Sequence, residues 1–155
     1  MLARAAILTW KVDVMNYLEH FIQQGAEVYV GNHLIADLWG IENHFNPESI
    51  LDCFSNACAD AGATVLFKHC HHFGEGCGTT GVIVLSESHA SWHHYPEVNL
   101  IVIDIFMCGS ANPLLAMPRI KEFWKPQLID LSDMKRGILD TTKVPARVAK
   151  MLERA

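Results

Sequence analysis

Residues 99–106 read Asn-Leu-Ile-Val-Ile-Asp-Ile-Phe, and residues 80–86 read Thr-Gly-Val-Ile-Val-Leu-Ser. Both segments are rich in Val and Ile and are flanked by glycines or turn residues, so we expect each to form a β-strand. Both are too apolar for the edge of a sheet, where one side of the strand meets water. Residues 63–70 have a similar composition and predict a third strand.

Two predicted helices flank these strands, and each begins with an asparagine followed by a proline. Asn46-Pro47-Glu48 supplies an N-cap, a proline at the first helical position and an acid in the first turn, which predicts a helix over residues 47–61. Asn112-Pro113 repeats this start. It predicts a second helix that runs to about Trp124, before Pro126 stops it.

The first forty residues predict a helix followed by a hairpin. Apolar residues recur at helical spacing from Asp13 to Gln24, which predicts an amphipathic helix. Residues 27–30 and 33–38 are short β-type segments separated by Gly31-Asn32, a pair that tolerates positive φ. We therefore expect a tight turn at this pair.

The order of these elements predicts the fold class. Residues 127–131 are a further candidate strand, and the basic segment 132–155 is typical of a solvated helix and turn. The sequence of helix, hairpin, helix, three strands, helix and strand predicts an α+β protein. We expect a two-layer sandwich, with an antiparallel-rich sheet and helices packed on one face. A length of 155 residues suits a single domain, residues 1–155.

Composition excludes several classes of function. Half of the residues are hydrophobic and 19% are charged, which favours a globular protein. The net charge of −5 offers no basic surface for a phosphate backbone, so we expect no nucleic-acid partner. The apolar stretch 5–10 is too short to span a bilayer, and we expect neither a targeting segment nor membrane binding. Five cysteines without CxxC spacing favour a reduced, cytoplasmic setting.

Histidines are concentrated in the middle of the chain, where one interpretation is a metal site. Of nine histidines, six fall within 26 residues: His69, His71, His72, His89, His93 and His94. On a strand, His69 and His71 would share one face, and nearby cysteines are also good zinc ligands. No HExxH motif or paired CxxC accompanies them. We therefore expect no metal.

Two further interpretations use the same region. In a nucleophilic hydrolase, Ser88 or Cys108 would be activated by His93, with Asp104 or Glu97 orienting the imidazole. No GxSxG motif is present to expose the serine. Alternatively, the histidines lie on strand surfaces and the cysteines are small buried apolar groups.

A longer, ordered motif supports a fourth interpretation. It consists of Gly81-Val-Ile-Val-Leu-Ser-Glu-Ser-His89, His93, Pro96-Glu97 and Asp104-Ile-Phe-Met-Cys108-Gly109. This motif resembles the signature of the bacterial and archaeal S-adenosylmethionine decarboxylases. The resemblance covers roughly residues 31–137, and segments 1–30 and 138–155 extend beyond this core.

The resemblance implies a self-processing enzyme with a pyruvoyl group and without pyridoxal phosphate. In that family the proenzyme cuts a Glu-Ser bond, here Glu87-Ser88. The Ser88 hydroxyl would attack the preceding carbonyl to form an ester. Elimination would then leave dehydroalanine, and hydrolysis would leave the pyruvoyl group. Its ketone can form a Schiff base with a substrate amine and accept the electrons released with CO2.

The resemblance also implies a role for five other residues. His93 corresponds to the base in self-processing, and Cys108 to the donor that reprotonates the substrate α-carbon. Thr80 stands where family members have a processing serine, and its methyl group restricts the hydroxyl. Phe73 is similar to the aromatic residue that stacks on adenine, and Glu97 to the acid that binds the ribose hydroxyls.

The substrate implied by the resemblance is S-adenosylmethionine, and the product is the aminopropyl donor for polyamine (spermidine) synthesis. Where the family often reads His-Thr-Trp-Pro-Glu, residues 93–97 read His-His-Tyr-Pro-Glu, and Met107 stands where a small polar residue is common. An enzyme that uses the same pyruvoyl group to decarboxylate ornithine or arginine is therefore an alternative. A non-catalytic homologue is another alternative. For the enzyme, we expect a small-molecule substrate and a homo-oligomer of processed protomers.

Overall fold

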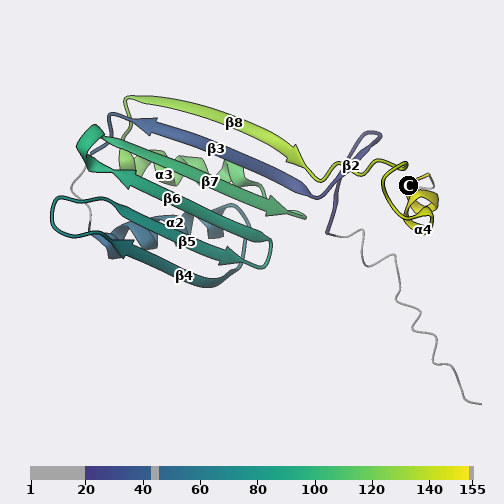
Figure 1. The fold of residues 1–155 in the computed structure, drawn as a ribbon, viewed down its shortest axis with the longest axis horizontal. Helices are drawn as coiled ribbons and strands as arrows, with labels where there is room; N and C mark the ends of the chain where they lie inside the picture. The colour runs from purple at the N-terminus through teal and green to yellow at the C-terminus, as the bar shows by residue number, and fades with distance from the viewer. Residues whose placement is uncertain (1–19, 43–45, 154–155) are drawn as a thin grey trace, which may run out of the picture.

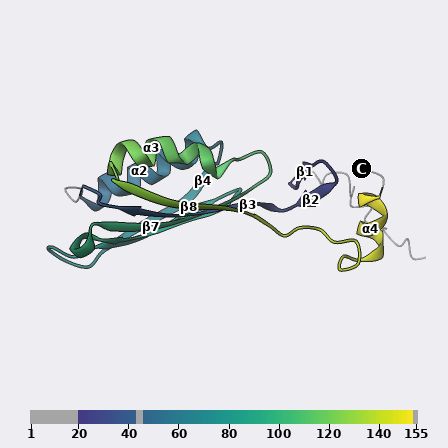
Figure 2. The same cartoon turned by 90° about the horizontal axis from the view of Figure 1, so that it is seen from above.

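A six-stranded antiparallel sheet forms the centre of the molecule (Figure 1). The computed structural model describes residues 20–42 and 46–153. The sheet has the strand order β4-β5-β6-β7-β3-β8. Its strands are β3 (Gly31–Trp39), β4 (Val65–His72), β5 (Thr79–Leu85), β6 (Ser88–Tyr95), β7 (Leu100–Cys108) and β8 (Leu128–Arg136). The helices α2 (Pro47–Asp60) and α3 (Met117–Trp124) lie side by side on one face of the sheet (Figure 2), which confirms the predicted two-layer α+β sandwich.

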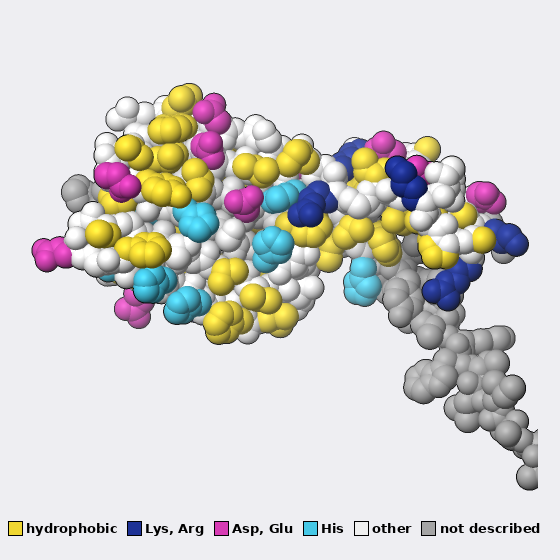
Figure 3. Space-filling view, viewed as in Figure 1, with side chains coloured by type: hydrophobic (Ala, Val, Ile, Leu, Met, Phe, Trp, Pro, Cys, Tyr) yellow, Lys and Arg dark blue, Asp and Glu magenta, His cyan; other side chains and the backbone are white. Residues whose placement is uncertain are grey.

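The two faces of the sheet differ because side chains alternate along each strand. On β7, Ile101, Ile103, Ile105 and Met107 are fully buried beneath the helices, and the residues between them face the other way. We call that second side the open face. Figure 3 views it and shows histidine side chains among hydrophobic ones. By strand alternation and register, its exposed large apolar residues are Trp39, Phe67, Val84, Tyr95, Leu128 and Met134.

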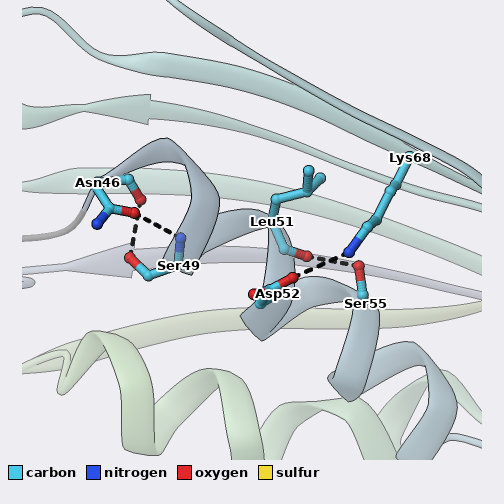
Figure 4. Close-up of polar contacts among 6 residues, drawn as sticks. All are labelled: Asn46, Ser49, Leu51, Asp52, Ser55 and Lys68. Atoms are coloured by element: carbon cyan, nitrogen blue, oxygen red, sulfur yellow. Dashed lines mark hydrogen bonds and ion pairs between the residues drawn. The ribbon is translucent and has the colours of Figure 1, made fainter.

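The first predicted helix forms as α2 (Pro47–Asp60). The side-chain oxygen of Asn46 accepts a hydrogen bond from the Ser49 N–H at 2.8 Å (Figure 4), and Pro47 begins the helix. Lys68 of β4 lies 3.0 Å from Asp52, so an ion pair joins α2 to the edge strand. The cap residues thus set the start of the helix as predicted.

The second predicted helix forms in two parts. A 3-10 turn, η2 (Pro113–Ala116), leads into α3 (Met117–Trp124). The Asn112 side chain accepts from the Leu114 N–H at 3.1 Å, as expected of a cap. Two further short helices are η1 (Pro96–Val98) and α4 (Ala146–Leu152). Within the described parts of the chain, no helix combines the length and apolarity needed to cross a membrane.

The predicted turn at Gly31-Asn32 is wrong, because both residues belong to β3. A Cβ atom on Gly31 would lie 2.2 Å from the Met107 carbonyl oxygen, so glycine permits close approach of β7. The hairpin of this region instead joins β1 (Ile22–Gln24) to β2 (Glu27–Tyr29), with Gly25 at φ +62°.

The helix predicted over residues 13–24 is also wrong at its end. Residues 22–24 form β1, and residues 13–19 lie outside the described part of the chain. The apolar spacing is compatible with a helix, but Gly25 permits a tight turn, and residues 22–24 pair with the strand that follows it. Figure 2 shows β1, β2 and α4 beyond one end of the sheet. Hydrogen bonds from Val30 N to Arg136 O and from Leu139 N to Val28 O join the region of β2 to the end of β8 and the segment after it.

The strands at residues 63–70, 80–86 and 99–106 are confirmed as β4, β5 and β7, and β5 and β7 lie inside the sheet as expected. Strand β6 was not predicted, since residues 88–95 include three histidines and two serines. Strand β8 runs beyond the predicted residues 127–131 because it pairs with the whole of β3. Residues 132–136 are therefore strand and not solvated helix.

Candidate active site

Glu87 and Ser88 lie at a tight turn between two central strands. Leu85 pairs with Ser88, which leaves Ser86 and Glu87 as the turn residues. We call residues 85–88 the 85–88 turn. Ser88 has φ +134°, a conformation that L-residues rarely adopt and that costs on the order of 1–3 kcal/mol. The surrounding structure must therefore hold the predicted cleavage site in place.

Cys108 lies directly beside this turn. Its backbone N–H donates a hydrogen bond of 2.9 Å to the Glu87 carbonyl oxygen, and its neighbour Met107 pairs with Ser88 across β6 and β7. An N–H aimed at a carbonyl oxygen polarises that carbonyl and stabilises negative charge developing on it. The carbonyl predicted to be attacked thus already has a hydrogen-bond donor.

Thr80 and His93 form a second pair, opposite each other on β5 and β6. The Thr80 hydroxyl lies 2.9 Å from His93 Nδ1 and donates to the Trp92 carbonyl oxygen at 3.3 Å. A hydroxyl has one proton and a carbonyl can only accept, so this arrangement favours an Nδ1–H that donates to Thr80. In the neutral form of His93 with this tautomer, Nε2 carries the lone pair that a base requires.

A cavity of about 540 Å³ adjoins this pair, and we call it the Phe73 pocket. It is lined by Phe73, Gly76, Cys77, Gly78, Thr79, His93, His94, Tyr95 and Glu97. The structure therefore brings together three predicted site residues, Phe73, His93 and Glu97. Phe73 is 62% exposed, and the His71 ring meets it edge-on with centroids 4.8 Å apart. Burial lowers the pKa of His94, which favours its neutral form.

The predicted site residues form two groups that one chain keeps apart. Ser88 and His93 are five residues apart on β6, which corresponds to about 16 Å along an extended strand. Glu87, Ser88 and Cys108 lie at one end of β6, and Thr80 and His93 lie toward the other, beside the Phe73 pocket. Spacing along the sequence did not reveal this separation.

The hydrolase interpretation requires Ser88 or Cys108 next to His93, but the strand pairing places both toward the other end of β6. Asp104, offered as its orienting acid, lies 3.3 Å from His33 Nε2 instead. Burial raises the pKa of the Cys53 and Cys58 thiols to about 12, so these two cysteines fit the packing interpretation. No group of three or more His, Cys, Asp or Glu among residues 20–42 and 46–153 is arranged to hold a metal ion.

A cluster beside Ser88 was missed by sequence reasoning. Phe106 lies on the open face between the rings of His33 and His89, each with its centroid 5.9 Å away. The Arg136 guanidinium lies 4.8 Å from the Phe106 ring centroid. Burial lowers the pKa of His89, and the neighbouring His33 and Arg136 add to this effect. These residues come from four strands, so only the register brings them together.

Comparisons with known proteins identify the family of this chain. The family model for S-adenosylmethionine decarboxylase matches residues 32–137. The S-adenosylmethionine decarboxylase proenzyme of Methanococcus maripaludis (strain C5) is 40% identical over 118 residues, covering 74% of this chain and 96% of the relative. The proenzyme of Thermomicrobium roseum is 32% identical over 111 residues, covering 71% and 96%.

A solved structure has the same fold. The crystal structure of the adenosylmethionine decarboxylase from Aquifex aeolicus matches with a TM-score of 0.64 and 32% sequence identity. The match covers 72% of this chain and 94% of that one. From the family match and from relatives that align over almost their whole length, the chain belongs to the S-adenosylmethionine decarboxylase family.

Proposed function

We propose that this chain is a proenzyme that cuts itself between Glu87 and Ser88 and becomes a pyruvoyl-dependent S-adenosylmethionine decarboxylase. Its products would be CO2 and decarboxylated S-adenosylmethionine, the aminopropyl donor for spermidine synthesis. The hydrogen bond from Cys108 N–H to the Glu87 carbonyl supports this proposal most directly, because it prepares one particular peptide bond for attack.

Self-processing uses residues of the 85–88 turn. The Ser88 Oγ attacks the Glu87 carbonyl carbon, the peptide C–N bond breaks, and an ester forms. Loss of the Ser88 Cα proton then expels the Glu87 carboxylate, which separates residues 1–87 from residues 88–155. Water replaces the nitrogen of the remaining dehydroalanine, releasing ammonia and leaving a pyruvoyl terminus. His93, with its unprotonated Nε2, is the proposed base for the Cα proton.

Turnover uses both groups of site residues. Once formed, the pyruvoyl group supplies the electron sink needed for CO2 release. We assign the Cys108 thiol to the proton that the substrate α-carbon then receives, because Cys108 adjoins residue 88. In the Phe73 pocket, the Phe73 ring offers a face to adenine, and Glu97 can accept hydrogen bonds from the ribose hydroxyls.

A homo-oligomer would bring the residues of the 85–88 turn next to those of the Phe73 pocket. Because Ser88 and His93 are about 16 Å apart within one chain, we propose that a second copy places its own Thr80, His93 and Phe73 pocket at this chain's Ser88. The open face is the proposed contact surface, since its exposed apolar side chains extend over five strands.

A cytoplasmic location also belongs to this proposal. The proposed proton donor, Cys108, must be a reduced thiol, and all five cysteines, which lie among the described residues, are free.

Intact-mass spectrometry and CO2 release together test the proposed function. Freshly purified protein should convert into two chains that meet at residues 87 and 88, and Ser88→Ala should stay a single chain. The cut protein should release CO2 from S-adenosylmethionine. A wild-type chain that remains uncut after prolonged incubation would contradict the maturation step.

A further inference from the structure

The 85–88 turn is attached to a segment far away in the sequence, the connection between α2 and β4. Two hydrogen bonds make this attachment. The Ser86 N–H donates to the Thr64 carbonyl oxygen at 3.0 Å. In return, the Thr64 N–H donates to Oε2 of Glu87 at 2.8 Å. A carboxylate that accepts a backbone N–H makes a charge-assisted hydrogen bond, which is stronger than one between neutral groups.

Thr64 is itself held by the core. The neighbouring Ala63 N–H donates to the carbonyl of Cys58, a fully buried residue of α2, at 3.0 Å. On its other side, Val65 pairs with Leu85 at the start of the same turn. The Thr64 N–H is therefore a fixed donor, and the Glu87 side chain joins the turn to the end of a packed helix.

Glu87 is consequently held at two points. Its carbonyl oxygen accepts from Cys108 N–H, and its carboxylate accepts from Thr64 N–H, on different sides of the turn. Together these bonds restrict rotation of the Glu87-Ser88 peptide, next to the unfavourable φ of Ser88. Attack by Ser88 Oγ depends on the orientation of that peptide, since a small misplacement of reacting atoms costs a large factor in rate.

We propose that the Glu87 side chain is a positioning residue for autocleavage, and that the hydrogen bond from Thr64 N–H to its carboxylate holds the peptide for the acyl shift. This inference rests on the proposed self-processing and adds a role for the side chain that precedes the cut. The function of the bond is geometric. An uncharged acceptor of the same length therefore serves in its place, and a shorter carboxylate does not.

Three variants test the proposal, with cleavage followed by intact mass. Glu87→Ala should cleave more slowly by on the order of 10- to 100-fold, as expected when a reacting group loses its orientation. Glu87→Gln keeps an acceptor oxygen at the same reach and should cleave within a few-fold of the wild-type rate. Glu87→Asp keeps the charge but is one methylene shorter, and should be slow. Glu75→Ala, at an exposed carboxylate of the β4–β5 loop, is the matched control and should cleave normally.

Hydroxylamine distinguishes the affected step. It splits an ester by forming a hydroxamate at Glu87 and freeing the Ser88 hydroxyl, but it leaves a peptide bond intact. If the acyl shift is slowed, hydroxylamine should not restore cleavage of Glu87→Asp to the wild-type rate. Circular dichroism should confirm that the slow variants retain the sheet.

Each contrary result has a definite meaning. Wild-type cleavage rates in folded Glu87→Ala and Glu87→Asp would overturn the positioning role and leave the proposed function intact. Rapid splitting of Glu87→Asp by hydroxylamine would also overturn it, because the ester would then have formed normally. A slow Glu87→Gln beside a fast Glu87→Asp would assign the effect to charge and reject the geometric role. An uncut wild-type chain would instead reject the proposed function itself.

Discussion

The hydroxyl of Thr80 on β5 lies 2.9 Å from Nδ1 of His93 and 3.3 Å from the Trp92 carbonyl oxygen, so one side chain connects the imidazole to the backbone of its own strand, β6. This connection leaves His93 Nε2 free to accept a proton. The tautomer of the proposed base therefore depends on Thr80.

Removal of the Thr80 hydroxyl should slow maturation. Thr80→Val keeps the shape but loses the hydrogen bond, and we expect a decrease in cleavage rate on the order of 10- to 100-fold, typical of an impaired general base. Thr80→Ser restores the hydroxyl without the methyl group that restricts it, and should cleave at least as fast as wild type. Time courses of intact mass measure both variants. Normal cleavage by Thr80→Val would show that the Thr80 hydroxyl has no role in self-processing.

Two defective chains should complement each other if a second copy completes the site. We expect Ser88→Ala to remain uncut and His93→Ala to cleave slowly when each is expressed alone. When they are co-expressed with tags of different mass, the His93 of the Ser88→Ala chain should promote cleavage of the His93→Ala chain. The control partner carries both substitutions and should not help. Failure of the mixed pair to cleave would place both residues in the same chain's site.

Cys108→Ala should separate maturation from turnover. The hydrogen bond to the Glu87 carbonyl comes from the Cys108 backbone, so alanine retains it and cleavage should proceed. Loss of the thiol should lower turnover on the order of 100-fold, typical for removal of a proton donor, or give wrongly protonated product. CO2 release and product mass measure this outcome. Full turnover would remove the Cys108 side chain from the mechanism.

Phe73→Ala should identify the substrate. Stacking and cation–π attraction of an adenine-bearing sulfonium are together worth on the order of 1–3 kcal/mol, so KM for S-adenosylmethionine should rise roughly 5- to 150-fold. Phe73→Tyr keeps the aromatic face and serves as the control. Ornithine and arginine gain little from such a face. Wild-type preference for either one, with little response to Phe73→Ala, would reject S-adenosylmethionine while leaving the pyruvoyl chemistry in place.

Mild acid should destabilise the folded chain through His94. Burial lowers its pKa in the folded state, so the unfolded state binds a proton at higher pH. The contribution of neutral His94 to the free energy of unfolding is fully present above the pKa of the unfolded state, about 6.5. It decreases as the pH falls toward the lower pKa of the folded state. Urea unfolding at pH 7.5 and pH 5.5, on a Ser88→Ala background that stays intact, should show this loss. His94→Phe, which keeps a ring against Trp124, should show less of it.

The parts of the fold that depend on local chemistry were predictable from the sequence. Asn46 and Asn112 mark both helix starts because a cap acts on N–H groups two or three residues away. Strand β7 was evident because its alternate Ile residues all enter the core. Strand β6 was not, since Trp92 is the one residue on its buried face that favours a strand, beside Ala90 and His94, which do not.

The arrangement of the candidate site depended on register, which the sequence does not reveal. The motif predicted Ser88, His93 and Cys108 as members of one site, but only the pairing of β5, β6 and β7 places Cys108 at residue 87 and His93 far from it. The contact of Thr64 with Glu87 had no signal, because the two residues are 23 positions apart in the sequence. The turn predicted at Gly31 is wrong for a similar reason. This glycine permits the close approach of β7, a contact that the sequence does not show.

The strand order determines what a cut between Glu87 and Ser88 does to the molecule. Residues 1–87 contribute β3, β4 and β5, and residues 88–155 contribute β6, β7 and β8. In the order β4-β5-β6-β7-β3-β8, one strand of the first fragment lies between two strands of the second. The fragments are therefore interleaved, and they can separate only if the β5–β6, β7–β3 and β3–β8 pairings all break. The cut protein would therefore remain one folded body, held together by three strand pairings in place of a single covalent bond.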